Sequence, residues 1–185
     1  MNDVKEAMET FPPEGMNLLL LNRRHRRKRF ESGEPCVDEW LIHKAIGAME
    51  KNTSTTRVLV ESDGTVAGYY TLANTALDVS LVLPALFGGK MPTKAPLTLT
   101  LAWLGVDRRF TGRGLGTKLF ACALADGVRV YHIVRFVAVV IDAITEQSLA
   151  FYQRMGFLPV PGTVDKLYLP ATTLLQVTAR AGEDG

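Results

Sequence analysis

The chain has 185 residues, enough for one domain with a full hydrophobic core, and its apolar content of 47% is typical of a globular protein. No apolar run is long enough to span a membrane, and residues 1–15 lack the basic start and apolar centre of a signal peptide. The formal net charge is only +2, and the two cysteines, Cys36 and Cys122, support neither a disulfide framework nor a metal site. We therefore expect a cytoplasmic protein with a flexible extension over residues 1–15, one domain over residues 16–178 and a frayed tail over residues 179–185.

The first elements expected along the chain are a short strand and a basic run. Leu18 to Leu21 is apolar and predicts the strand. Six cations then fall within seven residues: Arg23, Arg24, Arg26, Arg27, Lys28 and Arg29. On charge alone, a solvated loop is slightly preferred over a track for a nucleic-acid backbone.

Residues 30–49 predict an amphipathic helix that packs on a sheet. After the breakers Gly33 and Pro35, apolar residues recur at helical spacing: Val37, Leu41, Ala45 and Ala48. Trp40 lies beside this stripe.

A hairpin follows, with strands from Arg57 to Glu61 and from Val66 to Ala76 joined by Ser62 to Thr65. Tyr69 and Tyr70 are neighbours in the second strand and point to opposite faces. We therefore expect at most one of them to face the core.

The remaining pattern predicts a loop over residues 78–95 and then alternating strands and helices. Strands are expected over residues 97–106, 136–141, 157–160 and 166–169. Helices are expected over residues 113–130 and 145–156, the second capped by Thr145 and stopped at Gly156.

A glycine-rich turn from Val106 to Thr117 joins the strand over residues 97–106 to the next helix. Its three alternate glycines have no Cβ, so the backbone can approach a ligand closely. Exposed N–H groups, the positive end of the helix and three arginines favour a phosphate: Arg108, Arg109 and Arg113. By itself such a cluster is more often a tight turn, and its spacing matches neither G-x-G-x-x-G nor a P-loop.

A second motif lies further along the chain, from Thr145 to Phe157: TEQSLAFYQRMGF. Its presence favours a functional interpretation of the glycine-rich turn. The loop Thr111 to Gly116 and the helix end, Phe151-Tyr152 with Gly156-Phe157, together resemble the GNAT superfamily of N-acetyltransferases. In that superfamily an acyl-CoA pyrophosphate loop follows Q/R-x-x-G-x-G/A, and a late helix often ends in F-Y-x-x-x-G-F. Thr111 departs from the usual Gln or Arg, and Thr145 stands where many members have Asn.

The resemblance implies an α/β (α+β) fold, with a central mixed, mostly antiparallel twisted sheet of about six to seven strands flanked by about four helices. It implies acetyl-CoA as the acetyl donor and no metal. The donor-binding residues that it implies are Leu104, Gly105, Val106, Arg109, Thr111, Gly112, Arg113, Gly114, Leu115, Gly116, Thr117 and Ser148.

A narrower resemblance rests on F-x-S/C-G-E-P-x-x-D-x-W-L, G-Y-Y-x-L-A and V-D-R-x-x-x-G-R-G-L-G, found in Phe30 to Leu41, Gly68 to Ala73 and Val106 to Gly116. These segments are similar to the GNAT toxins of bacterial toxin–antitoxin pairs. Those toxins acetylate the α-amino group of aminoacyl-tRNA and so block translation. The resemblance implies a ribbon-helix-helix antitoxin that binds operator DNA together with the toxin, and a homodimer, with no membrane partner.

The resemblance also implies roles for particular side chains. Tyr152 is the candidate proton donor to the CoA thiolate, because a phenol of pKa about 10 stays protonated at neutral pH. Its neighbour Phe151 is expected to pack inside. Backbone N–H groups at the end of the strand over residues 101–106 could stabilise the oxyanion. Trp40 and the basic run from Arg23 to Arg29 are the candidate acceptor and tRNA contacts.

Two other functions stay open at this point. The chain could acetylate a small amine or a protein amine, which uses the same CoA site and Tyr152 but does not need the basic run. It could instead be a non-catalytic module that binds acyl-CoA or nucleic acid, which the presence of Tyr152 together with the glycine loop disfavours.

Overall fold

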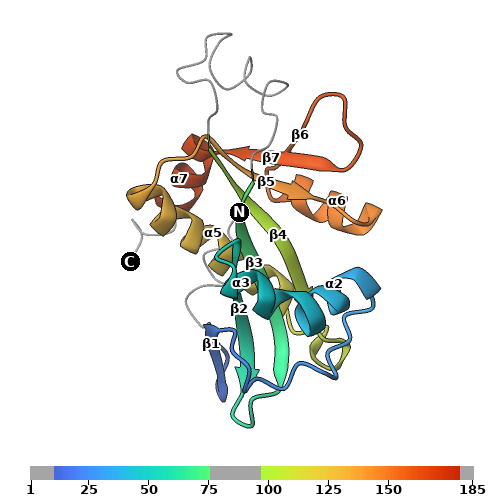
Figure 1. Ribbon diagram of the computed structural model, residues 1–185. Coiled ribbons are helices and arrows are strands. Elements are labelled where there is room, and N and C mark those ends of the chain that lie inside the picture. Colours follow the sequence, from blue (N-terminus) through green and yellow to red (C-terminus); the bar gives the residue numbers. More distant parts are fainter. Residues whose placement is uncertain (1–10, 76–96, 180–185) are drawn as a thin grey trace. The chain divides into compact units, whose positions relative to one another are not determined.

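The computed structural model (Figure 1) describes residues 11–75 and 97–179. The chain divides into two compact units. The N-terminal unit is described over residues 11–73 and 101–124, and the C-terminal unit over residues 74–75, 97–100 and 125–179. The loop expected over residues 78–95 lies outside the described residues, as do most of the N-terminal extension and nearly all of the C-terminal tail.

Seven strands follow the order β1-β2-β3-β4-β5-β7-β6 in one hydrogen-bonded sheet. β4 and β5 are parallel, whereas the pairs β1–β2, β2–β3, β5–β7 and β6–β7 are antiparallel. This arrangement confirms the predicted fold class of a mixed, mostly antiparallel sheet with helices. β4 (Thr98–Val106) contributes its first residues to the C-terminal unit and its last to the N-terminal unit.

The N-terminal unit contains β1 (Met16–Leu20), β2 (Ser54–Glu61) and most of β3 (Val66–Thr75). The predicted hairpin is confirmed: β2 and β3 pair in antiparallel register, with one irregularity between Leu59 and Val60. At the turn, Asp63 accepts hydrogen bonds from the backbone N–H and the hydroxyl of Thr65. Gly64 has a φ of +83°, which glycine adopts without strain.

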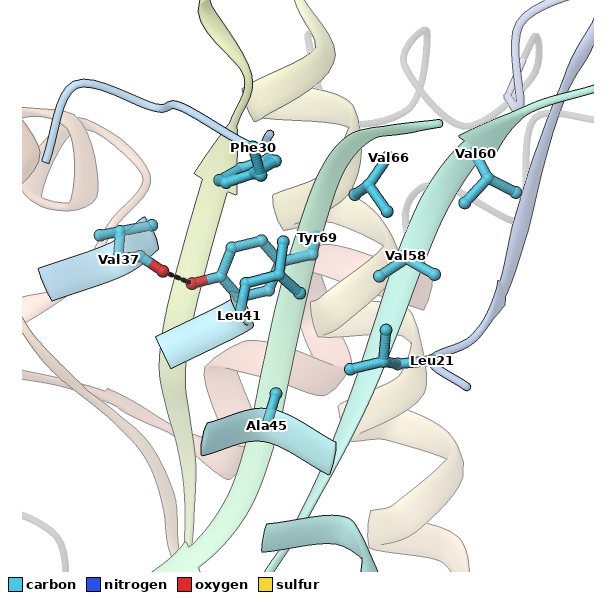
Figure 2. Close-up of a cluster of buried hydrophobic side chains, with 9 residues drawn as sticks. All are labelled: Leu21, Phe30, Val37, Leu41, Ala45, Val58, Val60, Val66 and Tyr69. Carbon is cyan, nitrogen blue, oxygen red and sulfur yellow. Dashed lines mark hydrogen bonds between the residues drawn. The ribbon is translucent and has the colours of Figure 1, made fainter. Parts of the chain in front are cut away.

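The predicted amphipathic helix is a run of three helical pieces: α2 (Pro35–Glu39), the π-helical turn η1 (Trp40–Lys44) and α3 (Ala45–Glu50). Val37, Leu41 and Ala45 are buried, as their spacing predicts. They form a hydrophobic cluster with residues of the sheet (Figure 2), in which the hydroxyl of Tyr69 donates to the carbonyl of Val37 at 2.6 Å. The sequence pattern did not predict the π-helical turn.

The expectation that at most one of Tyr69 and Tyr70 faces the core is wrong. Both side chains are fully buried. Tyr69 packs in the cluster beneath α2. Tyr70 is on the opposite face of β3, the face of Gly68. That face is covered by α5 (Leu115–Ile133), because a Cβ on Gly68 would lie 2.6 Å from Leu119. Because helices cover both faces of this strand, both tyrosines are interior.

The C-terminal unit contains β5 (Ala138–Asp142), α6 (Glu146–Arg154), β6 (Leu158–Pro159), β7 (Lys166–Pro170) and the second half of α5. These elements agree with the predicted strands and helices. A further helix, α7 (Ala171–Ala179), was not predicted. Its Leu174 is fully buried and lies 3.8 Å from where a Cβ on Gly127 of α5 would stand.

Candidate functional site

The glycine-rich turn is an exposed loop between the end of β4 and the start of α5. A 3-10 turn, η3 (Arg108–Phe110), comes first, and Thr111 to Gly114 are exposed. Gly112 and Gly114 have φ values of +76° and +68°, and a Cβ on either would meet no atom within 4 Å. Glycine is therefore needed at these two positions for the positive φ angles and not for close packing, and the space beside the loop is open.

The N-terminus of α5 follows this loop directly. This helix is 19 residues long, and the N–H groups of its first turn have no acceptor within the helix. Together with the helix dipole, such N–H groups favour bound phosphate. Gly116 lies inside the helix rather than in the turn, with the space beside it bounded by Val106 at 3.9 Å. That this loop binds the pyrophosphate of the donor stays a prediction of the sequence motif.

The guanidinium of Arg109, a predicted donor-binding group, is paired with Asp107. Its Nε and Nη2 donate to the two carboxylate oxygens at 2.8 and 2.7 Å. The Asp107 side chain is only 1% exposed, and burial alone would raise its pKa. Hydrogen bonds from Arg109 and from the Glu31 backbone outweigh burial and lower the pKa of this carboxyl.

Asp107 also ties the loop to a segment 76 residues earlier. The backbone N–H of Glu31 donates to Asp107 Oδ2 at 3.2 Å, and the Glu31 carbonyl accepts from the Arg108 N–H at 2.8 Å. The Arg108 guanidinium reaches the Glu31 carboxylate at 3.0 Å. The sequence predicted no role for Asp107, although this residue directly follows a strand and stands second in the V-D-R-x-x-x-G-R-G-L-G motif.

Of the three arginines, Arg113 is the one best placed to meet an anion. It makes no ion pair with any residue that the structure describes, and its guanidinium carbon lies 5.3 Å from the ring centroid of the buried Phe110. Thr111, which replaces the usual Gln or Arg, uses its hydroxyl locally to donate to the Arg108 carbonyl. The loop therefore offers backbone N–H groups and one arginine.

The end of β4 carries three predicted donor contacts, Leu104, Gly105 and Val106. Gly105 is buried, and a Cβ there would stand 2.6 Å from Val37 and 3.1 Å from Tyr69. Close packing of α2 on β4 thus explains this glycine, whether or not a ligand contacts it. Leu104 and Val106 are half-buried.

Tyr152, the candidate proton donor, lies on α6 in the C-terminal unit. Thr145 caps this helix as predicted, accepting from the Ser148 N–H, and the helix ends before Gly156 at a φ of +92°. Tyr152 is more buried than Phe151, which reverses the expected order, and burial raises the pKa of Tyr152 to about 12. Its phenol is therefore protonated at neutral pH.

Ser148, a predicted donor contact, uses its hydroxyl within the same cap. Its Oγ accepts from the Thr145 N–H at 3.0 Å and donates to the Thr145 carbonyl at 2.8 Å. The capping box therefore explains why a serine stands at this position, without any contact to the donor.

The basic run divides into paired and unpaired cations. Arg23 pairs with Glu50 at 2.6 Å, Arg26 with Asp63 at 3.0 Å, and Arg27 donates to the Ile42 carbonyl. The other cations are exposed and have no partner among the described residues: Arg24, Lys28 and Arg29. If the run binds a polyanion, these three have the most charge to offer.

Trp40 begins the π-helical turn and is half-buried. Its ring stacks on that of Trp103 in β4, with centroids 5.3 Å apart and planes inclined by 17°. Its Nε1 donates to the Thr71 hydroxyl, which pairs with the hydroxyl of Thr56. The sequence pointed to Trp40 but not to its two partners, Trp103 and Thr71.

Within residues 11–75 and 97–179, no three His, Cys, Asp or Glu side chains are grouped to hold a metal ion. None of the helices described there has both the length and the apolar character needed to cross a membrane.

Comparison with known proteins identifies the family. The Acetyltransferase (GNAT) family matches residues 18–157, and the chain belongs to it. A relative from Mycobacterium tuberculosis named tRNA-acetylating toxin is 33% identical over 152 residues, covering 82% of this chain and 87% of the relative.

Solved structures agree on the fold. AtaT complexed with acetyl-methionyl-tRNAfMet has a TM-score of 0.79 at 22% identity, covering 88% of this chain and 99% of AtaT. A tyrosine-to-phenylalanine mutant of the AtaT toxin, bound to the C-terminus of the antitoxin AtaR and acetyl-CoA, has a TM-score of 0.74 at 20% identity, covering 89% and 99%.

Proposed function

We propose that this protein transfers the acetyl group of acetyl-CoA to the α-amino group of aminoacyl-tRNA, and that it is the toxin of a toxin–antitoxin pair. The observation that carries the proposal is the 33% identity, over most of both chains, to a relative named tRNA-acetylating toxin. The exposed glycine loop at the start of α5 and the free cations of the basic run supply the two kinds of anion site that such a reaction needs.

The donor is held by the loop after β4. Backbone N–H groups from Gly112 to Thr117 and the guanidinium of Arg113 bind its pyrophosphate, with Leu104, Val106 and Ser148 as further contacts. Acetyl-CoA supplies an activated thioester. The role of Arg109 is to order this loop through Asp107, because its guanidinium is already paired there.

The acceptor amine needs little help from a base. A free α-amino group has a pKa of about 8, and esterification of the amino acid lowers it, so much of the acceptor is neutral at cellular pH. Backbone N–H groups at the end of β4 stabilise the oxyanion. The Oη–H of Tyr152, protonated at neutral pH because burial raises its pKa to about 12, donates its proton to the departing thiolate. The surplus proton of the attacking amine then passes through solvent to the tyrosinate, which restores the phenol.

The cellular setting follows from the same proposal. The tRNA backbone lies along the basic run, chiefly on Arg24, Lys28 and Arg29. A ribbon-helix-helix antitoxin neutralises the toxin and carries the complex to operator DNA. The domain over residues 16–178 acts as a homodimer in the cytoplasm, where charged tRNA is found.

Mass spectrometry tests the reaction directly. Fully charged tRNA is incubated with the protein and acetyl-CoA, digested with nuclease and analysed, with deacylated tRNA as the control. An N-acetyl-aminoacyl-adenosine is expected only from the charged sample. If none forms while acetyl-CoA still binds, the chain is instead an acetyltransferase for a small amine or a protein amine.

A further inference from the structure

Both tryptophans of the chain meet on one surface of the N-terminal unit. Trp40 and Trp103 stack face to face, and both are half-buried at the margin of the hydrophobic cluster around Tyr69. Stacking fixes the two rings relative to each other. Together they form a single aromatic surface, here called the tryptophan pair.

Hydrogen bonds from inside the unit hold this pair in place. Trp40 Nε1 donates to Thr71 Oγ1 at 3.1 Å, and the Thr71 hydroxyl pairs with that of Thr56 at 2.8 Å. Both threonines are fully buried. Because the single polar atom of the Trp40 side chain is used inside the protein, what the side chain presents outward is apolar.

Core packing by itself does not require this arrangement. Buried hydroxyls on a sheet face lined with apolar residues are costly unless they are hydrogen-bonded, and valine would fill the same space without that requirement. The backbone is also unusual here, because the Ala45 N–H bonds to the Trp40 carbonyl in a π-helical turn. Such turns are frequent at functional sites.

The pair lies beside the strand end to which the proposed function assigns the acetyl donor. Trp103 and Gly105 are two residues apart on β4, which places their Cα atoms about 7 Å apart on the same face of the strand. At Gly105 itself this face is filled by Val37 and Tyr69, so a group held against Trp103 lies about 7 Å along the strand from the proposed oxyanion site and does not contact Gly105.

We propose that the tryptophan pair receives the side chain of the amino acid being acetylated and selects apolar or aromatic side chains over small polar or charged ones. This inference rests on the proposed function and adds the substrate class. An apolar side chain gains contact with the indoles, whereas a charged one loses water and finds the Trp40 donor already occupied. Thr71 is a positioning residue that acts through Trp40.

The test uses one tRNA body charged in turn with phenylalanine, leucine, serine or aspartate. We expect kcat/KM for N-acetylation to be about tenfold to a hundredfold higher for the first two than for the last two. All four substrates carry the same terminal adenosine. If the tryptophan pair stacked on that base rather than on the amino-acid side chain, kcat/KM would be the same for all four.

Two matched variants test the role of Thr71. Thr71→Val removes the acceptor for Trp40 Nε1 and should reduce the selectivity at least threefold, whereas Thr71→Ser keeps the hydroxyl and should preserve it. Trp103→Phe, which retains an aromatic ring, should also reduce selectivity if Thr71→Val does not fold. Since both tryptophans belong to the pair, intrinsic fluorescence reports any change in the pair itself.

The outcomes separate the two proposals. Two results would overturn the role of the tryptophan pair and leave tRNA acetylation standing. One is equal acetylation of all four charged tRNAs. The other is a selectivity that neither Thr71→Val nor Trp103→Phe changes. If no charged tRNA is acetylated while acetyl-CoA binds, the proposed function fails, and this inference fails with it.

Discussion

Asp107 and Arg109 form a two-point ion pair in which both carboxylate oxygens accept from one guanidinium, at 2.8 and 2.7 Å. The Asp107 carboxylate is buried, although the Arg109 guanidinium is half exposed. The carboxylate also accepts a hydrogen bond from the backbone N–H of Glu31. One side chain thus holds the conformation of the glycine loop and fastens it to the segment that leads into α2.

Replacing Asp107 with Asn should loosen this loop. The variant loses charge-assisted hydrogen bonds worth about 1.5–3 kcal/mol, so the free energy of unfolding should fall by a comparable amount in urea titrations. Acetyl-CoA should bind more weakly by calorimetry. Glu31→Gln is the matched control, because Glu31 is exposed and its backbone contacts remain. Equal donor affinity in Asp107→Asn and wild type would contradict this role.

The same carboxyl predicts how stability depends on pH. Its pKa is lowered in the folded state, so its contribution to stability is present above the unfolded pKa of about 3.9 and is lost as pH falls through the lower folded value. Between pH 5 and pH 2, roughly the interval of this loss, wild type should lose more stability than Asp107→Asn. Parallel acid unfolding curves for the two proteins would refute the assignment.

Replacing Tyr152 with Phe should remove the proton donor while preserving the ring. Turnover should fall about 10²- to 10⁴-fold, and the dissociation constant of acetyl-CoA should stay unchanged. Tyr131→Phe on α5 is the control, because that tyrosine packs against Arg135 and Phe136 and has no proposed chemistry. Stopped-flow turnover with calorimetric binding makes the comparison, and full activity of Tyr152→Phe would exclude the phenol from the mechanism.

The basic run should act through its unpaired cations. Changing Arg24, Lys28 and Arg29 to Gln should raise the KM for charged tRNA and reduce the slope of log affinity against log salt by about 0.7 to 0.9 for each phosphate that is no longer neutralised. The control changes Arg23 and Arg26, which already pair with Glu50 and Asp63. If both sets of changes alter the slope equally, pairing does not decide which cations bind RNA.

Two glycines should respond in opposite ways to alanine. At Gly105 the new Cβ would overlap Val37, so unfolding free energy should fall by about 1–3 kcal/mol. At Gly116, inside α5, the nearest atom is 3.9 Å away, and alanine should stabilise the helix by about 0.5–1 kcal/mol. Thermal unfolding measures both effects. If Gly116→Ala is more stable but binds acetyl-CoA more weakly, the donor must come close to the first turn of α5.

Local pattern was sufficient wherever a feature depends on neighbouring residues. The hairpin at Asp63 and Gly64, the capping of α6 by Thr145 and the glycine loop before α5 were all predicted, because turn geometry and caps are decided within a few residues. Tyr152 lies in the helix that the sequence predicted, α6, and its role as proton donor stays a prediction.

Tertiary structure decided everything that depends on partners distant in sequence. Whether Tyr70 is buried depends on α5 covering the second face of β3, and whether Arg109 is free depends on a carboxylate that burial and Glu31 hold in place. The tryptophan pair joins residues 63 positions apart, and its threonines look like ordinary strand residues in the sequence. The amino-acid sequence determined the family and the conformation of the glycine loop before α5. The fold determined which of the candidate side chains are already bound to one another, because hydrogen bonds and packing across the sheet leave no periodic signal along the chain.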